Sequence, residues 1–164
     1  LKRCFDIVFA TVGLLVLSPV IAGIALAIKL DDGGSILYRQ KRTAVFGQTF
    51  NVYKFRSMVE NAETDTGATI SEEDAGGVDP RVTAVGRILR RTHLDEIPQL
   101  WSVLCGDMSV VGPRPERPEL DSDIQDGVVD WQKRWFVKPG LTDQTHILEG
   151  QLEFEFTVEN ETDE

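Results

Sequence analysis

The sequence is poor in the residues that crosslink chains or bind transition metals. It has two cysteines and two histidines in 164 residues, and Cys4 and Cys105 lie far apart. This excludes a disulfide framework and a Cys/His zinc site. Basic residues are also outnumbered, with 17 Lys and Arg against 27 Asp and Glu, giving a net charge of -10. Such acidity disfavours binding to nucleic acid, so we expect no nucleic-acid partner. A high-salt source and an ordinary acidic protein both fit this balance.

Charge is absent from one long segment, Ile7 to Ile28. Its length of about 22 residues corresponds to a helix of roughly 33 Å, enough to cross the hydrocarbon core of a bilayer. Three interpretations compete. The segment is a spanning helix, a signal peptide preceded by the basic residues Lys2 and Arg3, or a re-entrant hairpin that enters and leaves on one side.

The pair Ser18-Pro19 lies in the middle of this segment. Proline removes a helical hydrogen bond, and a break here leaves two legs of about 16 Å each. Basic residues flank both ends, and positive charge favours the cytoplasmic side. These features favour the re-entrant hairpin, with both ends on the cytoplasmic side, over the other two interpretations. Kinked spanning helices also contain proline, so this residue does not decide alone.

The remaining sequence predicts a small mixed domain. Residues 35–38 and 49–55 have the pattern of two strands, with Gly47 in the loop between them. Residues 82–91 form a cationic amphipathic helix, and a second helix begins near Asp95 with Pro98 in its first turn. We assign residues 31–148 to a folded domain and 149–164 to an acidic C-terminal tail.

Further patterns are weaker. Residues 60–80 are acidic and lack periodicity, which indicates a loop. Residues 110–115 contain two prolines and predict a rigid loop, and residues 118–134 predict an acidic helix.

Cations cluster on this acidic chain in a way that suggests a bound anion. Arg and Lys gather around residues 39–56, 81–91 and 114–117, and arginine suits phosphate oxygens. Asp95-Glu96 lies among them. These carboxylates are either the cap and first turn of a helix, or a nucleophile and magnesium ligands.

The segment DPRVTAVGRILRRTHLDEIPQLWSVLCGDMSVVGPRPE, residues 79–116, closely resembles the signature of the bacterial sugar transferases, the monotopic polyprenyl-phosphate phosphoglycosyl transferases. The resemblance extends to KRCFDIVFA, the Ser18-Pro19 break, YRQKR, YKFRSM and, weakly, VKPGLT, and so covers residues 2 to 142. The order and spacing of LDEIPQLW and GDMSVVGPRP make it specific.

The resemblance implies an α+β, mostly helical monotopic membrane protein at the cytoplasmic face of the cell membrane. A Pro-kinked re-entrant hairpin over residues 1–30 would precede a small cytoplasmic catalytic domain over residues 31–148, with interfacial amphipathic helices. The resemblance also implies that Asp95 attacks the β-phosphate of a UDP-sugar, expels UMP, and passes the sugar phosphate to polyprenol phosphate. Glu96 would assist, and Asp95 and Glu96 would hold Mg²⁺. We assign substrate-phosphate binding to a set of four cations, Lys54, Arg56, Arg90 and Arg114.

The sequence departs from the family pattern at several positions. Ser102 replaces an asparagine, Ala44 replaces a glycine, and residues 143–146 differ after VKPGLT. This last difference leaves sugar recognition open and motivates a second hypothesis, a catalytically silent membrane partner in glycan assembly. The sugar, the lipid, the oligomeric state and any glycan-assembly partners are not determined by the sequence.

Overall fold

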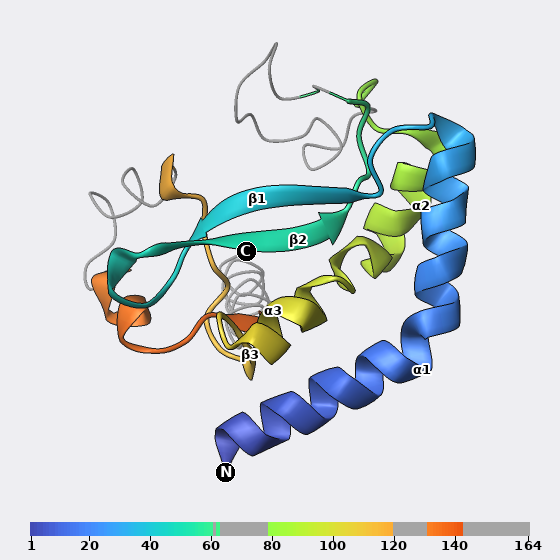
Figure 1. The fold of residues 1–164 in the computed structure, drawn as a ribbon. Helices are drawn as coiled ribbons and strands as arrows, with labels where there is room; N and C mark the ends of the chain where they lie inside the picture. Colours follow the sequence, from blue (N-terminus) through green and yellow to red (C-terminus); the bar gives the residue numbers. More distant parts are fainter. Residues whose placement is uncertain (61, 63–78, 120–130, 143–164) are drawn as a thin grey trace, which may run out of the picture. The chain divides into compact units, whose positions relative to one another are not determined.

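The computed structural model describes residues 1–60, 62, 79–119 and 131–142. They form four strands, three α-helices and three short 3-10 turns (Figure 1). In chain order these are α1 (Lys2–Asp31), β1 (Leu37–Thr43), η1 (Val45–Gly47), β2 (Thr49–Phe55), α2 (Ala84–Thr92), η2 (Leu94–Glu96), α3 (Gln99–Cys105), β3 (Ser109–Val111), η3 (Trp131–Phe136) and β4 (Gly140–Thr142). The mixed helix and strand content matches the predicted α+β class.

The chain divides into two compact units, each described by itself below. The first unit comprises Leu1–Ala10, Lys41–Asn51 and the chain from Ser102 onward, and the second comprises Thr11–Gln40 and Val52–Trp101. These units do not follow the predicted division at residues 30 and 148, which stays a prediction. The predicted acidic tail lies outside the described residues.

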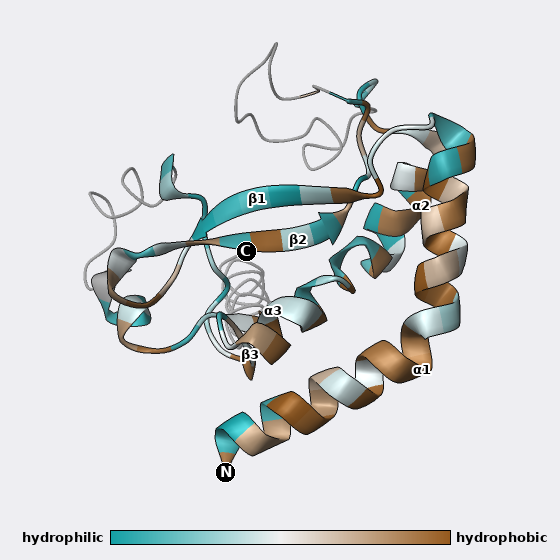
Figure 2. Cartoon of the chain, in the orientation of Figure 1, coloured by the Kyte–Doolittle hydropathy of each residue, from teal (hydrophilic) through white to brown (hydrophobic). Residues whose placement is uncertain are grey.

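Helix α1 is long and apolar enough to cross a membrane, judged by length and composition. Hydrophobic residues, interrupted by paler turns, lie between polar residues at its two ends (Figure 2). Large apolar side chains along it are exposed, including Val12, Leu15 and Val16. An exposed apolar surface of this size has no partner in water, so it indicates a membrane or protein contact. A signal sequence meets the same criterion, so the three interpretations above all remain.

Pro19 lies inside α1, which is one continuous helix that bends sharply near its middle (Figure 1). Proline has no N–H, so the carbonyl of Leu15 lacks its usual donor four residues later. The Ser18 hydroxyl replaces this donor with a hydrogen bond of 2.8 Å to the Leu15 oxygen. The helix therefore does not end at Ser18-Pro19. The Pro-kinked hairpin and the re-entrant placement of α1 in a membrane stay predictions.

Strands β1 and β2 pair in a two-stranded sheet, as the sequence predicted. The predicted range of β2 is confirmed, whereas β1 begins two residues later and ends five residues later than predicted. Exposed and half-buried residues alternate along β1 with the period of a strand. Most of these residues are polar, so the sequence shows no apolar alternation that would predict the full strand. The connection η1 contains two residues with positive φ, Phe46 at 58° and Gly47 at 71°.

The core of the second unit joins the C-terminal half of α1 to β2 and α2. Ile24 and Ile28 of α1 pack with Phe55 of β2 and Leu89 of α2, and all four are buried. Residues at these helical spacings share one face of α1. Partly buried apolar side chains surround this cluster, namely Ile21, Ile36, Val85, Leu94 and Ile97.

The first unit contains a small parallel sheet that the sequence did not predict. Strand β3 pairs with β4, with Ser109 opposite Gly140 and Val111 opposite Thr142. The expected rigid loop over residues 110–115 is therefore wrong at its start, because Val110 and Val111 belong to β3. The backbones of Gly112 and Gly140 approach each other closely beside this strand pair. A Cβ on Gly140 would lie 2.1 Å from the Gly112 nitrogen. A single methyl group there would force the backbones apart.

The same unit buries a charge from the start of α1. Asp6 is 4% exposed, and its carboxylate accepts hydrogen bonds of 3.0 Å from the Ser109 hydroxyl and the Val110 N–H. The Arg3 guanidinium donates to the carbonyls of Val103 and Leu104 at the end of α3. Cations suit helix C-termini because the last carbonyls lack intrahelical donors.

Candidate active site

The segment that carries Asp95 and Glu96 begins with an unusual backbone turn. Helix α2 ends at Thr92 and is capped by His93, which has a positive φ of 55° and donates its N–H to the Leu89 and Arg90 carbonyls. Such left-handed caps are usually glycine, so a histidine here carries some strain. The turn redirects the chain so that Leu94 packs against the core and η2 follows at once. The helix predicted from Asp95 is wrong at its start, because α3 begins only at Gln99.

Asp95 is 8% exposed, which is unusual for a carboxylate. Burial raises its pKa above the usual value of 3.8; Lys54 and Arg90 lower this pKa, whereas the neighbouring Glu96 raises it. Burial is the largest of these causes. The positive charges of Lys54 and Arg90 therefore offset part of the cost of burying the Asp95 charge. Such a balance is common for catalytic acids and bases.

Glu96 contacts a cation from strand β2. Lys54 Nζ donates to Glu96 Oε1 over 2.7 Å, and both side chains are 18% exposed. A charged hydrogen bond of this length is among the stronger polar contacts in proteins. The contact joins two segments that are 42 residues apart in the sequence.

Arg90 is the second cation near Asp95. It lies on α2, and its Nε donates to the Ser57 hydroxyl over 3.0 Å. The Ser57 carbonyl accepts from the Thr83 N–H at the start of the same helix. Ser57 thus fixes both the start of α2 and the Arg90 side chain. Four of the predicted site residues, Asp95, Glu96, Lys54 and Arg90, are brought together in the second unit.

Two other predicted phosphate ligands lie in different surroundings. Arg56 is buried in the second unit and pairs with Asp32. Arg114 belongs to the first unit, where it lines a pocket together with Pro113, Pro115 and Trp135. Its carbonyl accepts a hydrogen bond from Arg134, whose guanidinium stacks over Trp131 at 3.8 Å. The assignment of Arg56 and Arg114 to substrate phosphates stays a prediction.

A magnesium site at the acidic pair stays a prediction, and the chemistry of the residues fits it. Asp95 and Glu96 offer adjacent carboxylates, and Mg²⁺ typically uses one or two carboxylates together with substrate phosphates. Among residues 1–60, 62, 79–119 and 131–142, no group of three or more His, Cys, Asp or Glu is placed to hold a metal. A site completed by the substrate is compatible with this.

Sequence reasoning missed several buried polar contacts. Asp79 is 1% exposed, and its carboxylate accepts hydrogen bonds from the guanidinium and the backbone N–H of Arg81. Ser57, Asp6 and Asp32 were also missed. An aspartate beside an apolar helical segment, as at Asp6 and Asp32, predicts a buried polar contact only weakly, because acidic residues are common in this chain.

Comparison with known proteins places the chain in a family. Residues 1–163 match the bacterial sugar transferase family. The chain is 41% identical over 145 residues to the exopolysaccharide production protein PSS of Rhizobium leguminosarum bv. phaseoli, covering 87% of this chain and 70% of that protein. The chain belongs to the bacterial sugar transferase family. This confirms the resemblance seen in the sequence.

Two longer relatives have names that specify a reaction. The UDP-glucose:undecaprenyl-phosphate glucose-1-phosphate transferase of Escherichia coli (strain K12) is 46% identical over 149 residues, covering 90% of this chain and 31% of that protein. A UDP-N-acetylgalactosamine-undecaprenyl-phosphate N-acetylgalactosaminephosphotransferase of Aeromonas hydrophila is 35% identical over 150 residues, covering 92% of this chain and 34% of that protein. The chain spans about a third of the length of these two relatives.

Proposed function

We propose that this chain is a membrane-associated phosphoglycosyl transferase that moves a sugar-1-phosphate from a UDP-sugar to a polyprenol phosphate, and so initiates a membrane-linked glycan. The observation that carries the proposal is the buried Asp95 carboxylate, which has Glu96 beside it. Burial raises the pKa of Asp95, and the positive charges of Lys54 and Arg90 lower it. The names of the relatives support the donor and acceptor classes.

In the first step, an Asp95 oxygen attacks the β-phosphorus of the donor. The bond from that phosphorus to the bridging oxygen breaks, UMP leaves with the electron pair, and a phosphosugar-aspartyl anhydride remains. Carboxylate nucleophiles are established in phosphoryl transfer. Lys54 and Arg90 offset negative charge near the phosphates, which is the main protein contribution to such reactions.

In the second step, an oxygen of the polyprenol phosphate attacks the same phosphorus. The phosphorus–Asp95 bond breaks, the carboxylate is regenerated, and the lipid now carries a sugar diphosphate. Glu96 is suited to accept a proton or to hold Mg²⁺ with Asp95. The bound Mg²⁺ would supply charge neutralisation of the phosphates.

A membrane location follows from the acceptor and from α1. A polyprenol phosphate stays in the bilayer, so the aspartate must work at its surface. The exposed apolar side chains of α1 supply a contact with lipid, and Lys2, Arg3 and Lys29 favour the cytoplasmic side. We place the reaction at the cytoplasmic face of the cell membrane.

The experiment that tests this proposal detects the covalent intermediate. Detergent-solubilised protein is incubated with Mg²⁺ and a panel of UDP-sugars without lipid, and UMP release and intact mass are measured. We expect a phosphosugar adduct on the wild type and on Lys133→Ala, which removes an exposed cation of η3. We expect no adduct on Asp95→Asn. If no donor yields UMP or an adduct, the catalytic proposal fails and the silent-partner hypothesis gains weight.

A further inference from the structure

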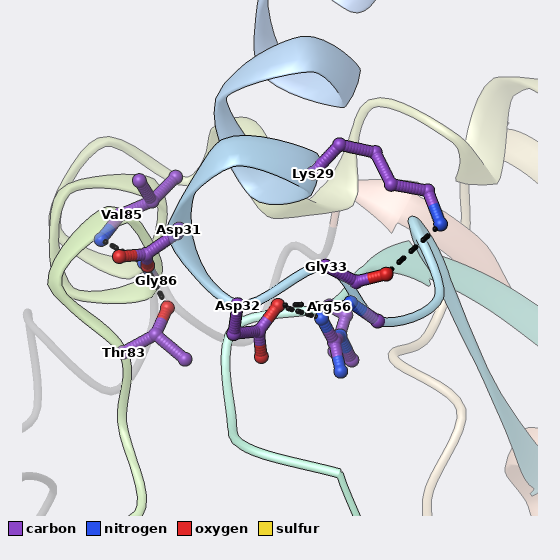
Figure 3. Close-up of polar contacts among 9 residues, drawn as sticks. Lys29, Asp31, Asp32, Gly33, Arg56, Thr83, Val85 and Gly86 are labelled. Atoms are coloured by element: carbon purple, nitrogen blue, oxygen red, sulfur yellow. Dashed lines mark hydrogen bonds and ion pairs between the residues drawn. The ribbon is translucent and has the colours of Figure 1, made fainter.

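The C-terminal end of α1 carries two consecutive aspartates that reach different elements of the second unit. Asp31 Oδ2 accepts a hydrogen bond of 3.2 Å from the backbone N–H of Val85, in the first turn of α2. Asp32 Oδ1 forms an ion pair with the guanidinium of Arg56, just beyond β2. Figure 3 shows Asp31 directed toward Val85 and Asp32 directed toward Arg56. The end of the apolar helix is therefore tied to both elements.

Arg56 is enclosed by this arrangement. Its side chain is 6% exposed, and Nε and Nη1 are buried without a hydrogen-bond partner among the described residues. Gly34 lies directly against the guanidinium, because a Cβ at that position would lie 2.1 Å from Arg56 Nη1. A side chain at residue 34 would therefore displace the guanidinium. Burial and the ion pair with Asp32 give Arg56 an internal partner and limit its contact with a diffusing phosphate.

Arg56 also follows Lys54 closely in the sequence. Phe55, between them, is 2% exposed and packs against Ile24 and Ile28 of α1. The two residues after Lys54 therefore both hold the end of β2 against the C-terminal half of α1. Arg56 directly follows β2, and its backbone N–H donates to the Ile36 carbonyl over 2.9 Å. Because Lys54 is the next-to-last residue of β2, a shift of Arg56 that loosens this end of the strand also shifts Lys54, whose Nζ lies 2.7 Å from Glu96 Oε1.

The second cation near Asp95 is held from the same place. Thr83 Oγ1 accepts from the Gly86 N–H over 2.9 Å, and Asp31 supplies another acceptor at the start of α2. Side-chain acceptors here satisfy N–H groups that have no partner within the helix. This helix carries Arg90. Lys54 and Arg90, the two cations near Asp95, thus both lie on elements that contact the end of α1.

We propose that Asp32 and Arg56 form a positioning joint between the membrane helix and the active site, in which Arg56 acts through Lys54 and does not bind substrate. The proposal rests on the proposed function and deepens it, because it assigns Arg56 to a different task from the phosphate binding predicted by sequence. Asp31 supports the same joint through α2.

Three variants perturb the joint in different ways. Asp32→Asn removes the partner charge, Arg56→Lys keeps the positive charge without the guanidinium fork, and Gly34→Ala displaces the guanidinium without changing any charge. We expect each to lower kcat by about 10- to 100-fold, the scale for a small misplacement of catalytic groups. The double variant Asp32→Asn/Arg56→Lys should be no worse than its worse single variant, because both remove one interaction.

Two controls match these changes. Gly23→Ala adds a methyl group to another glycine of the second unit, where a Cβ meets nothing within 4 Å. Lys133→Ala removes an exposed cation of η3. Both should leave kcat unchanged. A general loss of activity from any glycine substitution or any loss of a cation would appear in the controls as well.

The donor KM separates a positioning role from phosphate binding. If Arg56 binds substrate phosphate in competition with Asp32, then Asp32→Asn frees it and lowers the donor KM. If Arg56 is a positioning residue, Asp32→Asn lowers kcat and leaves KM within about twofold. A lowered KM in Asp32→Asn would overturn the proposal.

A thermal-unfolding measurement that needs no turnover distinguishes failure of the joint from failure of the proposed function. The contact that the joint is proposed to hold is the 2.7 Å hydrogen bond from Lys54 Nζ to Glu96 Oε1. If the joint positions Lys54, the effects of Asp32→Asn and Lys54→Ala on the Tm are not additive, because both changes disturb this one contact. The effects of Gly23→Ala and Lys54→Ala on the Tm should add. Additive effects of Asp32→Asn and Lys54→Ala would refute the joint even if the wild type releases no UMP.

Discussion

Two aspartates of the second unit, Asp79 and Asp95, are both removed from solvent but meet opposite surroundings. The Arg81 guanidinium binds Asp79 through two nitrogens and holds the pKa of that carboxyl far below its usual range. Asp95 has no such fork, and burial raises its pKa. The comparison teaches that burial of a carboxylate is not itself a sign of catalysis. The degree to which its charge is compensated separates a structural acid from a reactive one.

The largest expected difference between the two is in catalysis. Asp95→Asn should lower UMP release by roughly 10³-fold or more, because it removes the nucleophile. Asp79→Asn should retain turnover in the fraction that folds, since Arg81 occupies its carboxylate. UMP release per folded protein measures both. Equal losses in the two variants would erase the proposed distinction.

The compensation of Asp95 can be weakened directly. Lys54→Ala should lower kcat/KM by about 10²-fold, the usual cost of losing one charged donor in an active site. It should also shift the acid limb of the pH–rate profile to higher pH, because Lys54 lowers the pKa of Asp95. Lys54→Arg, which keeps the charge, should leave that limb closer to the wild type. An acid limb that does not respond to Lys54→Ala contradicts the assignment of Asp95 as the ionised nucleophile.

The ionised Asp79 carboxylate should stabilise the fold, because Arg81 binds its charge. A lowered pKa means that ionised Asp79 stabilises the folded state above the usual value of 3.8, and this contribution is lost as the pH falls. Asp79→Asn should therefore lower the Tm at pH 7 by several degrees, and the difference should narrow below pH 3.8. Thermal unfolding in detergent at both pH values measures this. A difference that widens in acid would show that Arg81 does not stabilise the charged form.

Asp95 should show the opposite sign. A raised pKa means that the charged carboxylate costs stability once the pH rises above the usual value of 3.8. Asp95→Asn should consequently raise the Tm at neutral pH, and the gain should vanish below pH 3.8. The expected gain is smaller than the loss in Asp79→Asn, because Lys54 and Arg90 already offset part of the cost. A Tm lowered by Asp95→Asn at pH 7 would argue against this account.

The smallest expected effect concerns the turn of α1 at Ser18. Ser18→Ala removes the hydroxyl that donates to the Leu15 carbonyl. The cost should be about 1 kcal/mol or less, as for a typical single hydrogen bond. Ser18→Thr keeps a hydroxyl and should retain most of the stability. A loss of several kcal/mol would mean that this carbonyl depends on Ser18 alone.

Much of the site could be predicted from the sequence because its residues are close together in the chain or fall in a specific motif. The spacing of apolar residues predicted α2 and β2, and LDEIPQLW identified Asp95 and Glu96. Strand β1 was mispredicted because its polar residues mask the alternation. The positive φ of His93 left no sequence signal, since glycine is the usual residue at such a cap.

By itself, the sequence determined the apolar helix, the acidic pair and the cations from which the site is made, because these depend on residue type and local spacing. Only the tertiary structure decided which cation meets which carboxylate. Lys54 pairs with Glu96 and Arg56 with Asp32, although Lys54 and Arg56 are two residues apart and chemically similar. The physical reason is that Phe55 and Gly34 fix the end of β2 against α1, and packing of that kind depends on contacts between distant segments.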